Sequence, residues 1–273
     1  METKEPQHPH PIVVNRMGGL GNQLFQYAAA RAVAHHHPGQ IYVQEETDNP
    51  HNHKKYDYAL IFMKHAVVAQ VSPSYRHEFH QASSFVPWQP ETIHPPVKLF
   101  GYFQYLPAIQ PILFDLVLEY RDALCPFRPH FVSPETSLFI HVRRGDYLKL
   151  PQYHYIQTKT YYENAFREWR KHYVGDDFHV FLMSDDPEWC REQSWSFPYI
   201  LYENDDEVQT LAMMSQCTAG AIISNSSFSY WVPCCPRVPV SFTQRDGLQK
   251  PSIIYSLLTG VVSKDRTMYD WRI

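Results

Sequence analysis

A glycine-rich turn between a short apolar run and a helical pattern constrains this chain more than any other feature. The run IVVN at 12–15 is typical of a buried strand. GGLGNQ follows at 18–23, and apolar residues then recur at helical spacing as far as residue 36. Pro38 and Gly39 end this helix, and a second apolar run occupies 41–44. Strand, helix and strand in this order predict a unit of parallel sheet.

The rest of the chain repeats this alternation. We expect no regular structure over most of 45–96, where His, Pro, Asn and Ser dominate. We expect a connector at 125–134. Strands are predicted at 97–103, 137–142, 179–183, 199–202, 219–224 and 238–242, and helices at 109–122, 159–173, 207–217 and 228–234. This pattern predicts an α/β chain of two doubly wound halves, in which ligands bind beyond the carboxyl ends of the strands.

Composition excludes several classes of protein. The chain has 273 residues, 44% of them hydrophobic and 19% charged, which is typical of a folded globular protein. A net charge of -4 argues against nucleic-acid binding. The polar first ten residues lack a signal peptide's apolar core, and the apolar run at 253–262 is too short to span a membrane, so we expect it in the core. Five cysteines without a CxxC pair predict neither a disulfide framework nor a zinc ribbon. We therefore expect a soluble, cytoplasmic chain with no integral membrane segment.

The GGLGNQ turn is the first candidate site. Gly19 and Gly21 would let the backbone approach a ligand, and N–H groups at the start of a helix attract anions. A dinucleotide fingerprint would need a third glycine at position 24, where Leu24 stands. The alternative is an ordinary tight turn in which Asn22 caps the helix.

The second candidate is HVRRGDY at 141–147, which leaves a predicted buried strand. A guanidinium group suits phosphate oxygens. His141 and Arg143 share one face of the strand and Arg144 the other, so we expect Arg143 to meet the ligand. The alternative is a salt bridge at the sheet edge, such as Arg144 with Asp146.

The third candidate is a pair of loops. Asp185 and Asp186 follow the strand at 179–183, and their carboxylates suit a guanine edge or a ribose. Ser226, Ser227 and Phe228 follow the strand at 219–224, where hydroxyl and backbone N–H groups suit phosphate. Helix caps are the alternative for both loops.

Together these strings resemble the α-1,2-fucosyltransferases of glycosyltransferase family 11. The resemblance runs from about residue 12 to 242, and HxRRxDY is its most specific motif. The strings that carry it are MGGLGNQLFQYAAARAVA, GYFQ at 101–104, HVRRGDY, YYENA at 161–165, MSDD at 183–186 and ISNSSFSYW at 223–231.

This resemblance implies a GT-B-like fold of two Rossmann-like halves with the active site between them. The acceptor half would cover 11–125 and the donor half 136–273. The enzyme would be an inverting galactoside-type 2-α-L-fucosyltransferase that moves L-fucose from GDP-β-L-fucose to the 2-hydroxyl of a galactose-type glycan. By similarity, the GDP site would comprise His141, Arg143, Asp185 or Asp186, and Ser226 to Phe228, with Gly19, Gly21 and Asn22 opposite.

The residues suit this chemistry without a metal or other cofactor. Arg143 and backbone donors would stabilise the departing diphosphate. Asp146 is the candidate general base, and Asn22 would orient the acceptor or a phosphate. Animal and plant proteins of this pattern are anchored in the Golgi, so a Golgi location is expected only for a shortened form of such a protein. The segment 49–96 has no family string and is expected to shape the acceptor site. The acceptor and the oligomeric state stay open.

Three other functions compete with this reading. A NAD-dependent oxidoreductase would explain the first unit but not HVRRGDY. A non-catalytic carbohydrate-binding protein would use the aromatic residues, 15% of the chain, to stack on sugars. A metal-dependent glycosyltransferase would use an acidic pair such as Asp185 and Asp186, but the histidines show no metal-ligand spacing.

Overall fold

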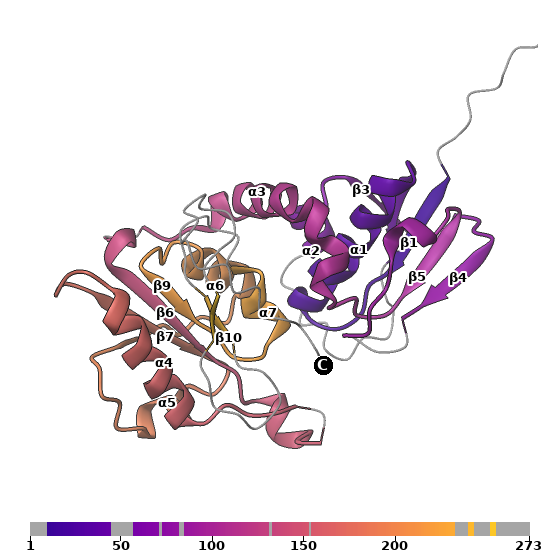
Figure 1. Cartoon of the computed structure of the whole chain (residues 1–273). Helices are drawn as coiled ribbons and strands as arrows, with labels where there is room; N and C mark the ends of the chain where they lie inside the picture. Colours follow the sequence, from indigo (N-terminus) through magenta and orange to yellow (C-terminus); the bar gives the residue numbers. More distant parts are fainter. Residues whose placement is uncertain are drawn as a thin grey trace, which may run out of the picture.

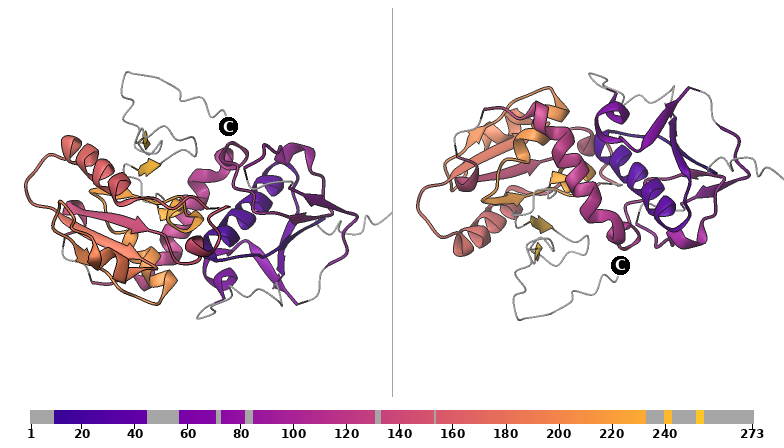
Figure 2. Two further views of the ribbon diagram at one scale, coloured as in Figure 1. Left: turned by 90° about the horizontal axis from the view of Figure 1, so that it is seen from below. Right: turned by 90° about the horizontal axis from the view of Figure 1, so that it is seen from above.

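The computed structural model describes residues 10–44, 57–70, 73–81, 85–130, 133–152 and 154–232, and the backbone of 240–242 and 252–254. Two sheets lie side by side, and helix α3 (Leu113–Leu124) lies between them along one side (Figures 1 and 2). Within the described ranges, no helix combines the length and the apolar character that crossing a membrane requires.

The first sheet has the strand order β3-β2-β1-β5-β4, and all its strands are parallel. Its central strand is buried because Ile12, Val13 and Val14 are apolar in sequence. The order reverses between β1 and β5, so the loops that follow these two strands lie next to each other. The strands are β1 (Pro11–Asn15), β2 (Gln40–Gln44), β3 (Ala66–Ala69), β4 (His77–His80) and β5 (Val97–Phe100).

The expectation that 45–96 is mostly loop is wrong where the structure describes this segment. It contains helix α2 (Tyr58–Phe62), strands β3 and β4, and a 3-10 turn at Pro90–Thr92. Both strands lie at sheet edges and are largely exposed, so neither shows the alternation of a half-buried strand. Helix α2 has only five residues, too few to reveal a helical period.

The second sheet has the order β11-β10-β9-β6-β7-β8, and only β11 is antiparallel within it. This is the doubly wound order 3-2-1-4-5-6, with its reversal between β6 and β9. The strands are β6 (Ser137–Val142), β7 (His179–Ser184), β8 (Ile200–Leu201), β9 (Gly220–Ile222), β10 (Val240–Phe242) and β11 (Ser252–Ile254). The helices are α4 (Lys159–His172), α5 (Pro187–Glu192), α6 (Glu207–Met214) and α7 (Ser227–Tyr230).

Most predicted elements of this half are found, with shorter ends. The strand expected at 219–224 covers only 220–222, and the helix expected at 207–217 ends at 214. In the first half, the helix expected at 109–122 begins at 113, because Pro111 lies in the 3-10 turn Leu106–Ile112 before it. Of the run at 253–262, residues 253 and 254 belong to β11 and the remainder lies outside the described residues.

The two halves share a continuous apolar core around helix α1 (Leu20–His36). Most side chains of α1 are buried, the polar Gln23 and Gln26 among them, as expected for a helix covered on most of its surface. Phe25 packs against Trp231 of the second half, with ring centroids 4.7 Å apart, and Tyr120 of α3 lies 5.2 Å from the same indole. Tyr58 of α2 also donates to Glu207 of α6 at 2.9 Å. The two halves therefore meet across buried contacts.

Candidate active site

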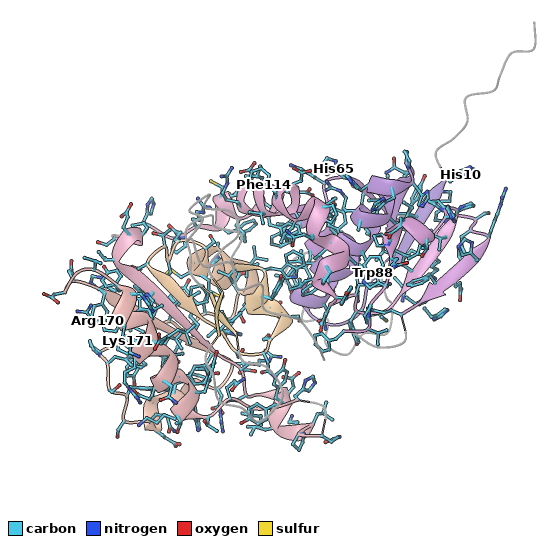
Figure 3. All side chains as sticks on the ribbon, in the orientation of Figure 1. His10, His65, Trp88, Phe114, Arg170 and Lys171 are labelled. Carbon is cyan, nitrogen blue, oxygen red and sulfur yellow. The ribbon has the colours of Figure 1, made fainter. Side chains whose placement is uncertain are left out.

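Five loops at the carboxyl ends of strands are joined by contacts into one site. Those after β1 and β5 come from the first sheet, and those after β6, β7 and β9 come from the second. Asn22, in the turn after β1, contacts the loop after β9 through Ser227. Tyr147 and Arg143 join the β6 loop to the β9 and β7 loops. The basic end of α4, marked by Arg170 and Lys171 in Figure 3, lies on the far side of the second half from the first.

The GGLGNQ turn is held by two glutamines of α1. Gln26 accepts from the N–H of Met17 at 2.9 Å and donates to its carbonyl oxygen at 3.1 Å. Gln23 donates to the carbonyl oxygen of Gly18, whose φ of +71° favours glycine. Asn22 does not cap the helix, since the N-cap is Gly19 and no side chain bonds there. The predicted alternative for Asn22 is therefore wrong.

Gly19 and Gly21 differ in their surroundings. A Cβ atom at Gly19 would meet nothing within 4 Å, whereas one at Gly21 would lie 2.4 Å from the backbone N of Phe228. Gly21 thus allows α1 and α7 to pack backbone against backbone, and its carbonyl oxygen accepts from Trp231 Nε1 at 3.0 Å. Of these two glycines, Gly19 alone has open space where a Cβ atom would lie.

The carboxamide of Asn22 connects three loops. Its Oδ1 accepts from Gln104 Nε2 at 2.8 Å and from Ser227 Oγ at 2.7 Å. Gln104 ends the GYFQ string after β5, and Ser227 begins α7. Asn22 thus lies where the two halves meet.

Arg143 is held by two carboxylates at the end of β6. Its Nη2 lies 2.9 Å from Asp146 Oδ1, and its Nε lies 3.1 Å from Asp185 Oδ2. Neither contact has hydrogen-bond geometry, so Nε of Arg143 and Oδ1 of Asp146 are buried without a hydrogen bond in the described part of the chain. The guanidinium group also lies 5.6 Å from the ring centroid of Tyr147. A buried donor of this kind is a candidate for binding an anion.

Arg144 points the other way, as the alternation predicts. It lies 4.1 Å from the ring centroid of Trp189 on α5 and donates to Asp186 Oδ2 at 3.1 Å. Asp186 Oδ1 accepts from the N–H of Trp189 and caps α5, so both of its oxygens are engaged. Arg144 therefore pairs with Asp186, and the expected alternative of a pair with Asp146 is wrong. Asp185 accepts from the N–H of Arg144 at 2.9 Å, so it faces the arginine loop.

His141 lies buried behind Arg143. Burial, and then the charge of Arg143, lower its pKa to about 3, so the imidazole is neutral near pH 7. Its Nδ1 lies 3.3 Å from Ser224 Oγ, and its ring lies 5.7 Å from that of Phe228. A neutral imidazole adds no second charge beside Arg143.

The loop after β9 is fixed from both sides. Ser226 is buried and caps α7 by accepting from the N–H of Phe228. Tyr147 donates to the carbonyl oxygen of Asn225 at 3.4 Å, and burial raises the pKa of this tyrosine. Tyr147 also stacks on His154, with ring centroids 4.1 Å apart.

Gln104 and Tyr147 contribute contacts to the site, although neither was named among the candidate residues predicted from the sequence. GYFQ offered a signal, because a glycine after an apolar strand marks a special turn. Gly101 has a φ of +142°, and Phe103 adopts a φ of +53°, which is uncommon for a residue with a side chain. Among the described residues, no three His, Cys, Asp or Glu side chains group as a metal site.

Two Rossmann-like sheets that meet at their carboxyl ends define a GT-B-like fold. The NodZ α-1,6-fucosyltransferase co-crystallised with GDP, an enzyme of Bradyrhizobium, has this fold. It superposes with a TM-score of 0.56 over 92% of this chain and 99% of its own, at 14% identity. This confirms the predicted fold class.

The family resemblance is also confirmed. Residues 125–234 match the family "Glycosyl transferase family 11". The O-antigen biosynthesis glycosyltransferase WbnK of Escherichia coli is 31% identical over 49% of this chain and 48% of its own. An α-1,2-colitosyltransferase of Escherichia coli is 33% identical over 35% of this chain and 34% of its own. The mouse galactoside α-(1,2)-fucosyltransferase 2 is 24% identical over 81% of this chain and 67% of its own. The alignments with the two bacterial relatives thus cover half of their length or less.

Proposed function

We propose that the chain is an inverting glycosyltransferase that moves L-fucose from GDP-β-L-fucose to the 2-hydroxyl of a galactose-type sugar. The observation that carries the proposal is Arg143, held by Asp146 and Asp185 at the strand reversal of the second sheet. A donor with a diphosphate leaving group suits this cation. The names of the mouse, colitosyl and NodZ enzymes support a fucose-like donor sugar.

The proposed mechanism uses this chain's own residues. Arg143 would stabilise the negative charge that develops on the diphosphate, with Gly19 leaving the backbone of the opposite turn accessible. Asp146 would accept the proton of the attacking hydroxyl. Its contact with Arg143, 2.9 Å from Nη2 to Oδ1, fixes the place of this carboxylate. No step of this scheme requires a metal ion.

The structure argues against a dinucleotide site at the first turn. The backbone of α7 fills the space beside Gly21, where a pyrophosphate would approach a dinucleotide-binding turn. The alternative of an NAD-dependent oxidoreductase therefore loses its one supporting motif. A non-catalytic carbohydrate-binding protein stays an outcome of the test.

Calorimetric titration with GDP, UDP and NAD, each with EDTA, tests the donor site. We expect GDP alone to bind, and Arg143→Ala to abolish this binding. Arg121→Ala is the control, because among the described residues Arg121 pairs only with its exposed neighbour Asp122 on α3. Binding of NAD, or no binding of GDP, would refute the proposal.

A turnover assay tests which sugar is transferred and which linkage is formed. GDP-fucose and nucleotide-linked colitose are offered with a panel of galactosides, and NMR of the product identifies the linkage. An α-1,2-fucoside supports the proposal. An α-1,6-fucoside, or colitose transfer alone, would correct the linkage or the sugar. GDP and sugar binding without turnover would favour the non-catalytic alternative.

A further inference from the structure

We propose that Gln104 is a positioning residue that turns the carboxamide of Asn22 so that its Nδ2 faces the diphosphate of the donor. This inference rests on the proposed function, because its ligand is the GDP part of that donor. It concerns the GYFQ turn after β5.

The first step is the saturation of Asn22 Oδ1. A carbonyl oxygen offers two lone pairs for hydrogen bonds. Gln104 Nε2 uses one at 2.8 Å and Ser227 Oγ uses the other at 2.7 Å. While Gln104 and Ser227 act as donors, as they do here, Nδ2 cannot take the place of Oδ1, because an amide nitrogen does not accept hydrogen bonds. The two donors therefore fix which end of the amide is left for a ligand.

The second step is the position of Nδ2. Within the described part of the chain, this nitrogen makes no hydrogen bond to protein, and Asn22 is partly exposed. A Cβ atom at Gly18 would lie only 2.6 Å from it. Nδ2 therefore projects over the backbone of the glycine turn, beside the open Gly19.

The third step concerns how Gln104 reaches Asn22. Phe103 is fully buried in the left-handed region, and its N–H donates to Gln81 Oε1 at 2.5 Å. Strain of this kind persists where the surrounding structure enforces it, and it is common at functional sites. The turn thus delivers the side chain of Gln104 to the carboxyl end of β1.

The chemistry selects the ligand. An amide nitrogen donates hydrogen bonds and cannot take a proton from an attacking hydroxyl. It therefore suits an anionic oxygen, and a diphosphate provides several. This geometry therefore favours Asn22 as a residue that orients a phosphate of the donor and not as one that orients the acceptor sugar.

Calorimetric titration of GDP into single variants tests the inference. Gln104→Met keeps the length of the side chain and removes the donor, and we expect the Kd for GDP to rise about two- to tenfold, as for one hydrogen bond. Gln104→Glu should weaken binding further, because a carboxylate repels Oδ1, attracts Nδ2 and reverses the amide. Ser227→Ala removes the other donor and is a second variant should Gln104→Met fail to fold.

A matched control variant and the order of the GDP affinities distinguish a positioning role of Gln104 from a general loss of stability. Gln193→Met removes a comparable bond, from Nε2 to the carbonyl oxygen of Trp189 at 3.0 Å, and should leave the Kd unchanged. If wild type binds GDP and Gln104→Met binds it equally well, or Gln104→Glu binds no worse than Gln104→Met, the inference is wrong and the proposed function stands. If wild type does not bind GDP, the proposed function fails first.

Discussion

The buried imidazole of His141 should make the stability of the protein depend on pH in a predictable way. Its pKa is about 3 in the folded chain, against an ordinary value of 6.5, because burial and Arg143 oppose its protonation. Between these two values the unfolded chain binds a proton that the folded chain refuses. The free energy of unfolding therefore falls as the pH drops below 6.5.

The size of this effect follows from linkage. The free energy of unfolding changes by about 1.4 kcal/mol per pH unit while only the unfolded state is protonated. From pH 7.5 to pH 5.5 the contribution of His141 integrates to about 1.4 kcal/mol, the equivalent of roughly 3–5 °C in melting temperature for a chain of this size.

Urea denaturation at pH 5.5 and pH 7.5 measures this contribution. His141→Gln keeps a polar partner for Ser224 and does not titrate. The loss of stability on acidification should be smaller in this variant than in wild type by about 1.4 kcal/mol. His35→Gln, which removes an exposed histidine, is the control. Equal losses in wild type and His141→Gln would show that the imidazole is protonated in the folded state, and would refute the reasoning.

Three further outcomes follow from single contacts. Gly21→Ala should lower the free energy of unfolding by about 1–3 kcal/mol, as for an overpacked core, because its Cβ atom would clash with the backbone of α7. Gly19→Ala is the control, and equal melting temperatures of the two variants would contradict the packing role of Gly21. Asp146→Asn should abolish turnover with only a small change in GDP affinity, and turnover within twofold of wild type would remove Asp146 as the base. Glu119→Ala should lower the free energy of unfolding by about 3 kcal/mol, because it removes the carboxylate that pairs with Arg31 and accepts from the hydroxyl of Tyr27. Glu188→Ala at an exposed pair should change the free energy of unfolding in urea by less than about 0.5 kcal/mol.

The sequence predicted the parts of the fold that depend on periodicity. Strand β6 was predicted to the residue and helix α1 with approximate ends, because the strand is a largely apolar run and the helix is long. Strands β3 and β4 escaped prediction because edge strands carry exposed residues on both faces. Their pairing depends on neighbours that are distant in sequence.

The same division holds for the site. Alternation along β6 predicted that Arg143 and Arg144 would diverge, and they do. Spacing could not show that Gly21 faces α7 and not a ligand, because that contact joins positions some 200 residues apart. Nor could it show that both oxygens of Asp186 are engaged within the protein. Contacts between the two halves could not be predicted from any local sequence pattern.

The contact between Gly21 and α7 also limits how the halves can move. Two backbones in direct contact cannot approach further, and the bond from Trp231 to Gly21 resists their sliding. We expect any closure around a ligand to be a rotation with its pivot at this point. The outer strands β4 and β8 would then move furthest, while Asn22 and Ser227, close to the pivot, would keep their contact during the rotation. Fluorescent labels on these outer strands should report the swing when GDP binds, and an unchanged separation would mean that the hinge is rigid.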